Sequence, residues 1–163
     1  MYTTSILAFL GFALVCAAAA TPGILCRPGI WYRDLVKPSW RPPNWLFGPV
    51  WLVLYVSIAV SGWLVWRQVG FSAATLAFVV FGAQLILNGF WSVIFFGLHR
   101  PDLAFLEIVG LWLSIVATIA VFHPIEPLAA YLLVPYACWV GFAVVLNYCI
   151  WRLNPAHASS SAP

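Results

Sequence analysis

The chain has 163 residues, of which 64% are hydrophobic and only 7% carry a formal charge. So few ionisable groups cannot coat the surface of a soluble globule of this length, and lipid must therefore solvate most of the chain. The net charge of +3 sits in the segments between the apolar runs, where it reports membrane orientation and gives no support to nucleic acid as a partner.

Five apolar runs without Asp, Glu, Lys or Arg follow one another along the chain, at 1–26, 47–66, 68–97, 108–122 and 127–151. All but the fourth reach the roughly 20 residues that a hydrocarbon core requires, and the fourth reaches that length if it begins near Leu103. The runs are continuous rather than alternating, which indicates helices and not a β-barrel. We expect an all-α integral membrane bundle, one domain over 1–154, with helices at about 4–26, 46–67, 73–97, 103–122 and 128–151.

The positive charges predict the orientation of these spans. One side receives Arg27, Arg33, Lys37, Arg41, Arg100 and Arg152, and the other receives Arg67. This asymmetry places the amino terminus outside and the carboxyl terminus in the cytoplasm. Hydrophobic helices favour the cytoplasmic membrane of a bacterium. A cleaved signal peptide is the alternative for the first span, although no Lys or Arg precedes it.

The segment 27–45 reads RPGIWYRDLVKPSWRPPNW and is the most distinctive part of the sequence. Three of its prolines, Pro38, Pro42 and Pro43, prevent a helix from running across them. Its aromatic residues are too apolar for a flexible linker, so we expect a stiff aromatic flap over the cytoplasmic mouth of the bundle. An interfacial belt of Trp, Tyr, Lys and Arg is the alternative, but it does not need the prolines. The tail 155–163 is expected to be disordered.

Three spans each carry polar, aromatic and small residues on one helical face. The faces are Gln84, Asn88, Trp91, Ser92 and Phe95; Pro135, Trp139, Ala143, Leu146 and Asn147; and Trp51, Tyr55, Ile58 and Gly62. Polar groups are costly against lipid, so these faces should point into the bundle. Interhelical packing explains such faces as well as a pocket does. The 10 Trp and the 17% of aromatic residues favour a pocket for a flat apolar ligand.

Other candidate groups are few. Glu107 is the only acid within a span, and we expect it to reach the membrane surface or pair with Arg100, with a functional role as the alternative. His99 and His123 lie in loops, where haem ligation has little support. We find no catalytic constellation, and the four cysteines lack C-x-x-C spacing, so no metal site is predicted.

Several long motifs resemble one known family. They are WY at 31–32, L-x-K-P-S-W-x-P-P-x-W at 35–45, F-G-P-V-W at 47–51, Q-L-x-L-N-x-x-W-S-x-x-F-F-G at 84–97 and L-L-V-P-Y-x-x-W at 132–139. Through them the chain, over about 5–154, is similar to the tryptophan-rich sensory protein and translocator protein family (TspO/MBR), also called peripheral-type benzodiazepine receptors.

The resemblance implies a five-helix bundle that forms a homodimer in the lipid bilayer. It implies binding of porphyrins, haem-like tetrapyrroles, sterols and synthetic isoquinoline or benzodiazepine ligands beneath the first cytoplasmic loop, with no resident cofactor. By motif position the pocket residues are Tyr32, Trp51, Tyr55, Asn88, Trp91, Ser92, Trp139, Ala143 and Leu146. Leu146, Tyr148 and Arg152 match the family's proposed sterol-recognition stretch, which is a weak pattern. Tyr55 and Trp91 stand where some relatives have Phe.

The resemblance therefore implies a membrane receptor, sensor or translocator for porphyrin-like or sterol-like small molecules. The runner-up is an enzyme that degrades porphyrin with light and oxygen, with Trp51 and Trp139 at the reacting face. A structural assembly protein is a third possibility. Ion-coupled transport has less support, because no span carries buried charge pairs or broken-helix repeats.

Overall fold

The computed structural model describes residues 2–26 and 28–155, so Arg27 and the tail 156–163 lie outside the described residues. The chain forms five helical spans that are long and apolar enough to cross a membrane. The helices are α1 (Tyr2–Leu25), α2 (Ile30–Asp34), α3 (Asn44–Ala73), α4 (Thr75–Ser92) with the π-helical turn η1 (Val93–Gly97), α5 (Pro101–Phe122), α6 (Pro127–Leu132) and α7 (Val134–Leu153). Within the described residues there is no strand, and the expected all-α membrane bundle is confirmed.

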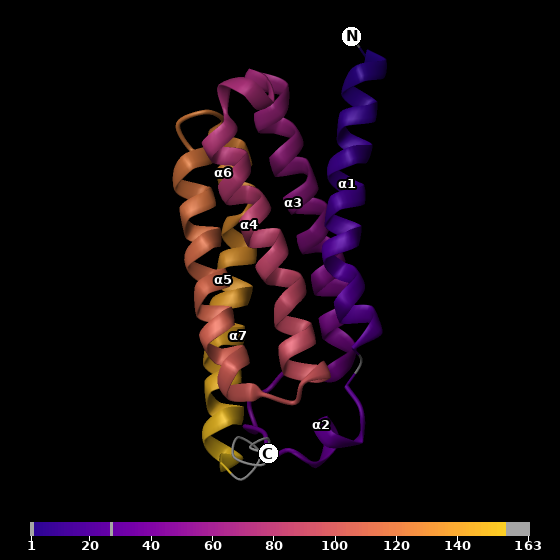
Figure 1. Ribbon diagram of the computed structural model, residues 1–163, viewed down its shortest axis with the longest axis vertical. Helices are drawn as coiled ribbons and strands as arrows, with labels where there is room; N and C mark the ends of the chain where they lie inside the picture. The colour runs from indigo at the N-terminus through magenta and orange to yellow at the C-terminus, as the bar shows by residue number, and fades with distance from the viewer. Residues whose placement is uncertain (1, 27, 156–163) are drawn as a thin grey trace.

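The spans form one elongated bundle, in which α4 packs on α5, α5 on α7, and α1 on both α3 and α4 (Figure 1). Short connections make consecutive spans antiparallel neighbours. The one long connection carries α2 and lies across the end of the bundle at which α7 finishes (Figure 1). The segment 28–43 is therefore placed to close that end.

Two spans differ in detail from their expected form. The second span runs past 67, and α3, with its bounds at Asn44 and Ala73, consists of two helices that meet at a kink at Gly70, where φ is 71° and ψ is 179°. Glycine adopts this positive φ readily, which allows the chain to turn there. The fifth span covers Pro127–Leu153, close to the expected range, with a turn at Leu133 that divides it into α6 and α7. Pro135 has no N–H to donate, which suits the first turn of α7 rather than a continuous helix.

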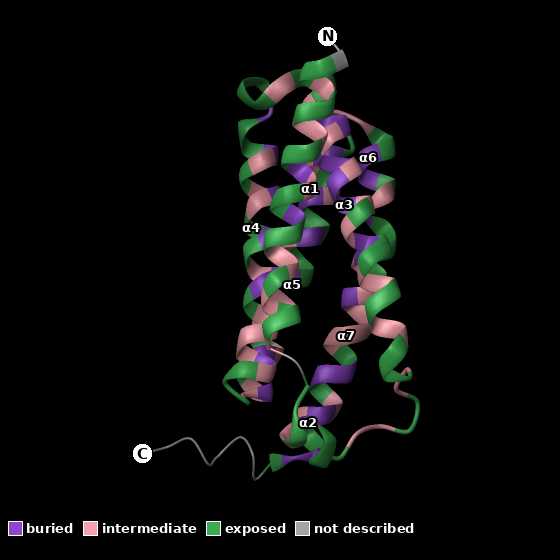
Figure 2. Cartoon of the chain, turned by 90° about the vertical axis from the view of Figure 1, so that its right-hand side faces the viewer, coloured by how far each residue is buried: buried purple, intermediate pink, exposed green. Residues whose placement is uncertain are grey.

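Buried side chains form two hydrophobic clusters. The larger cluster joins α1, α3, α4, α5, α6 and α7, and its buried residues gather toward the end opposite α2 (Figure 2). The smaller cluster lies at the α2 end and consists of Tyr32, Leu35, Phe95, Ala104, Leu146 and Ile150. Trp91 packs against both clusters, so it marks the level at which they meet.

Close helix contact in the larger cluster depends on Gly62 of α3. A Cβ atom at this position would lie 2.8 Å from the ring of Phe12 and 2.9 Å from that of Phe81. Both rings come from neighbouring spans, α1 and α4. The absence of a side chain at Gly62 therefore lets three helices meet, as small residues do at membrane helix interfaces.

Candidate ligand-binding cavity

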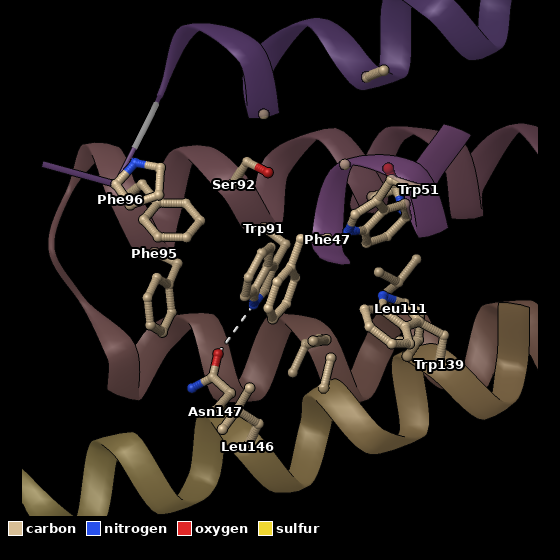
Figure 3. A pocket seen from close by; sticks show the side chains of 18 of the residues that line it. Phe47, Trp51, Trp91, Ser92, Phe95, Phe96, Leu111, Trp139, Leu146 and Asn147 are labelled. Atoms are coloured by element: carbon tan, nitrogen blue, oxygen red, sulfur yellow. Dashed lines mark hydrogen bonds between the residues drawn. The ribbon is translucent and has the colours of Figure 1, made fainter. Parts of the chain in front are cut away.

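A cavity of about 410 Å³ lies between α1, α3, α4, α5 and α7, beside the α2 segment (Figure 3). Its wall is mainly aromatic, with Tyr32, Phe47, Trp51, Tyr55, Trp91, Phe95, Phe96 and Trp139. The polar lining residues are Asn44, Asn88, Ser92 and Asn147. Predominantly apolar walls with a few placed polar groups are typical of small-molecule sites.

All nine residues that the motifs pointed to line this one cavity: Tyr32, Trp51, Tyr55, Asn88, Trp91, Ser92, Trp139, Ala143 and Leu146. They come from the α2 segment, α3, α4 and α7, which are far apart in the sequence. The structure thus brings parts of the three predicted faces together, whereas four of their members, Ile58, Gly62, Gln84 and Pro135, do not line the cavity. Their role in binding a ligand stays a prediction.

Asn88 connects three spans at the wall of the cavity. The Tyr55 hydroxyl donates to Asn88 Oδ1 at 2.5 Å, and Asn88 Nδ2 donates to the Tyr136 hydroxyl at 2.9 Å. Asn88 is 5% exposed and Tyr136 is fully buried, so these bonds are shielded from solvent. The network fixes the amide of Asn88 and uses one of its two N–H donors in these contacts.

Trp91 is fixed in the same way. Its indole N–H donates to Asn147 Oδ1 at 3.0 Å (Figure 3). Asn147 Nδ2 in turn donates to the carbonyl oxygen of Pro101 at 2.8 Å, at the start of α5. The Trp91 ring also stacks on Phe95, with centroids 5.2 Å apart and planes at 27°. These contacts therefore fix the orientation of the Trp91 indole in the unliganded protein.

Two further tryptophans complete the aromatic wall. The ring centroids of Trp51 in α3 and Tyr55 are 5.4 Å apart, and those of Trp139 in α7 and Phe47 are 5.6 Å apart. Together with Trp91 they present indole rings from three different helices to one cavity (Figure 3). Such an arrangement is suited to stacking against a planar ring system.

The chain is similar to known proteins over nearly its whole length. Residues 6–152 match the model of the TspO/MBR family. The chain belongs to the TspO/MBR family. It is 40% identical to protein CrtK of Rhodobacter capsulatus, over 93% of this chain and 95% of that protein. It is also 40% identical to human translocator protein, over 76% and 75% of the two chains. It is 38% identical to a tryptophan-rich sensory protein of Cereibacter sphaeroides, over 90% of each.

Family membership and the five apolar spans together make this TspO/MBR chain a multi-pass membrane protein. The resemblance stated from the motifs is thereby confirmed.

Some lining residues of this TspO/MBR chain were missed by the sequence patterns. Ala20 and Gly23 contribute from α1, where a Cβ atom at Gly23 would lie 3.4 Å from Ser92 Oγ. Small apolar residues in an apolar span give no facial signal. Phe96 was missed because η1 widens the helix, so that Phe95 and Phe96 both reach Tyr32, at 6.2 and 5.4 Å. A π-helical turn of this kind is frequent at functional sites.

Two cations of the α2 segment, Lys37 and Arg41, interact with residues that line the cavity. Arg41 Nη1 donates to Oδ1 of Asn44, a lining residue, at 2.7 Å. Burial raises the pKa of Tyr32, and the nearby Arg41 acts in the opposite direction, so the phenol stays protonated at neutral pH. Burial and then the charge of Arg41 lower the pKa of Lys37. Arg41 thus interacts with two lining residues, Tyr32 and Asn44, whereas Lys37 lies over the Tyr32 ring, 4.8 Å from its centroid.

The expected environment of Glu107 is wrong. Arg100 pairs instead with Asp102, with Nη2 and Oδ2 2.6 Å apart and Nε donating to Oδ1 at 2.8 Å. Both carboxyl oxygens of Glu107 are buried and have no hydrogen-bond partner in the described part of the chain, so the side chain does not reach the surface. Asp102, two residues from Arg100, is the nearer partner. Within residues 2–26 and 28–155 the amide of Gln84 is also buried without a hydrogen-bond partner, and neither Gln84 nor Glu107 lines the cavity.

The sterol-motif residues do not share one site. Leu146 lines the cavity, whereas Tyr148 is 43% exposed and packs against Phe105, with ring centroids 5.4 Å apart. Arg152 is exposed in the last turn of α7. The two candidate haem-ligating histidines lie outside the cavity lining, His99 against Trp31 at 4.5 Å and His123 against Tyr131 at 5.8 Å.

Proposed function

We propose that this TspO/MBR protein is a membrane receptor, sensor or translocator that binds porphyrins and sterol-like apolar ligands in the cavity beside α2. The observation that carries the proposal is the convergence of Trp51, Trp91 and Trp139 on one cavity of about 410 Å³. The names of relatives, a translocator protein and a tryptophan-rich sensory protein, support a membrane sensor or translocator role.

A flat tetrapyrrole matches the chemistry of the wall. Its ring would stack on the indoles, which favour offset or edge contacts with other aromatic systems. Asn88 and Ser92 would supply hydrogen bonds, since both line the cavity and Asn88 is already held by Tyr55 and Tyr136. A sterol would use the same apolar surface with fewer polar contacts.

The propionate groups of a porphyrin need a cation, and Arg41 is the one we propose. Its guanidinium bonds Asn44, which lines the cavity, and lies beside Tyr32, which also lines it. A guanidinium–carboxylate contact is a charge-assisted hydrogen bond and is stronger than a neutral one. Bound in this way, the ligand would place its ring among the indoles and its acidic edge at the α2 end.

We further propose the orientation and assembly. Arg33, Lys37, Arg41, Arg100 and Arg152 lie in or beside the α2 segment and at the ends of spans on the same side, which supports a cytoplasmic α2 end by the positive-inside rule. The cytoplasmic membrane of a bacterium and a homodimer are part of the same proposal.

Titration with protoporphyrin in detergent tests the function. Saturable quenching of tryptophan emission is expected, with one porphyrin per chain. Trp139→Ala and Asn88→Ala should each weaken the affinity about tenfold or more, because each removes a wall contact. Trp112→Ala is the control, since this tryptophan is 37% exposed and does not line the cavity. Equal weakening by all three variants would contradict the assignment of the cavity.

Illumination of the complex in oxygen separates a receptor from an enzyme. A receptor keeps one bound porphyrin per chain, whereas repeated conversion of excess porphyrin into an open-chain product would identify an enzyme. Loss of that turnover in Trp51→Phe and Trp139→Phe would locate the reaction in the cavity. A chain that shows neither binding nor turnover would be an assembly protein.

A further inference from the structure

Asn154, the first residue after α7, clamps the backbone of Val36 in the α2 segment. The Val36 N–H donates to Asn154 Oδ1 at 2.9 Å, and Asn154 Nδ2 donates to the Val36 carbonyl oxygen at 2.9 Å. Nδ2 also donates to the carbonyl oxygen of Ile150 at 2.8 Å, and the residue is only 6% exposed. The side-chain amide thus pairs with both polar groups of one residue and is anchored to the last turns of α7.

The segment that Asn154 holds is braced internally. Lys37 Nζ donates to the carbonyl oxygens of Tyr32, Arg33 and Leu35, at 2.5, 3.1 and 2.6 Å. The ammonium group also lies over the Tyr32 ring, 4.8 Å from its centroid. Val36 lies between Leu35 and Lys37, so a clamp on Val36 restrains the whole unit from Tyr32 to Lys37.

Both elements that Asn154 joins, the α2 segment and α7, contribute residues to the cavity lining. Tyr32, on the segment side, is 8% exposed, lines the cavity and packs against Phe95 and Phe96. Ile150, on the α7 side, also lines the cavity. Asn154 itself is not a lining residue, although it connects two elements that are.

We infer that Asn154 is a positioning residue for the ligand, acting from outside the cavity by holding Tyr32 and the α2 segment against α7. The inference rests on the proposed function. Without the clamp the segment samples more arrangements, and ordering it becomes a cost of binding. A segment already fixed before binding avoids that cost.

A double-mutant cycle with protoporphyrin as the probe tests this role. Asn154→Ala should raise the Kd about tenfold, because the α2 segment loses its two hydrogen bonds to Asn154 and must then be ordered when the ligand binds. Combined with Tyr32→Ala, it should add little to the effect of Tyr32→Ala alone, because both changes remove the same contact. Asn154→Asp, which keeps the acceptor for the Val36 N–H, should give an intermediate Kd and guards against misfolding of the alanine variant.

Ser61→Ala is the matched control. Ser61 Oγ donates to the carbonyl oxygen of Ala129 at 2.7 Å. This buried hydrogen bond joins α3 to α6, and neither residue lines the cavity. Its loss should leave the Kd unchanged within about twofold. Hydrogen exchange at the Val36 amide supplies a direct readout, and it should accelerate about tenfold or more in Asn154→Ala but not in Ser61→Ala.

The outcomes separate the two proposals. Faster exchange at Val36 with a wild-type Kd would overturn the positioning role and leave the proposed function intact. Fully additive losses in the double variant would also overturn it. Absence of saturable quenching in the wild-type protein would overturn the proposed function, and the positioning role with it.

Discussion

The indole N–H of Trp91 donates to Asn147 Oδ1 at 3.0 Å and so joins α4 to α7 at the wall of the cavity (Figure 3). Asn147 extends the connection to α5 through the carbonyl oxygen of Pro101 at 2.8 Å. Asn147 is only 2% exposed, so its amide depends on these partners rather than on solvent. The hydrogen bond therefore stabilises the fold and orients a cavity wall at the same time.

Trp91→Phe should destabilise the protein by about 1–3 kcal/mol, because it leaves the buried Oδ1 of Asn147 without its donor. Thermal unfolding in detergent, followed by circular dichroism, measures the loss. The double variant Trp91→Phe/Asn147→Leu should be more stable than the Trp91→Phe variant, since the unpaired Oδ1 is removed, although the Pro101 carbonyl oxygen loses the bond from Asn147 Nδ2. A double variant that loses the sum of both single effects would contradict the importance of this pair.

Asn88→Leu should cost more than Tyr55→Phe. The first change leaves the phenols of Tyr55 and Tyr136 without their partner and should cost about 1–3 kcal/mol. The second leaves one buried acceptor, Asn88 Oδ1, without its donor while Asn88 keeps its bond to Tyr136, so it should cost about 1 kcal/mol, the low end of the same range. Thermal unfolding of the two variants in the same detergent ranks them, and the reverse order would show that Asn88 is not the centre of the network.

Gly62→Ala should lower stability by about 1–3 kcal/mol, because the new methyl group would lie 2.8 Å from Phe12 in a packed interface. Gly110→Ala is the matched control, since no atom lies within 4 Å of a Cβ built there. That change should be neutral or slightly stabilising, as alanine favours helix. Melting temperatures of both variants test the prediction, and a neutral Gly62→Ala would show that α1 shifts freely.

Glu107→Gln should raise the melting temperature. Among the described residues the buried carboxyl oxygens have no hydrogen-bond partner, so a charge there is costly, and glutamine removes the charge at nearly the same size. Porphyrin affinity should not change, because Glu107 does not line the cavity. A variant with normal stability that no longer binds porphyrin would instead give Glu107 a functional role.

The sequence was sufficient for the parts of this fold that a short-range pattern encodes. Continuous apolar runs predicted the five spans, and the cost of polar groups in lipid placed Asn88 and Trp91 on an inward face. The motif resemblance added Tyr32, which no helical periodicity would select. Its place in the cavity lining agrees with that expectation.

Contacts between distant residues could not be predicted in this way. The hydrogen bonds between Asn154 and Val36 join residues 118 positions apart, and no local sequence pattern predicts them. Ala20 and Gly23 look like any small residues of an apolar span, so their place in the cavity lining depends on how α1 packs on α3 and α4. The pairing of Arg100 with Asp102 rather than Glu107 is a local contact, but it depends on side-chain geometry that the sequence pattern does not contain.

The most direct test of the central claim fills the cavity and leaves the rest of the molecule alone. Ala143 lines the cavity, whereas Ala117 is exposed on α5, so Ala143→Trp and Ala117→Trp add the same indole in different places. Protoporphyrin titrations of both variants should show wild-type affinity for Ala117→Trp and a loss of at least about tenfold for Ala143→Trp, since a tryptophan occupies the volume of a stacking ring. Wild-type affinity in Ala143→Trp, with one porphyrin bound per chain, would place the ligand elsewhere and contradict the account.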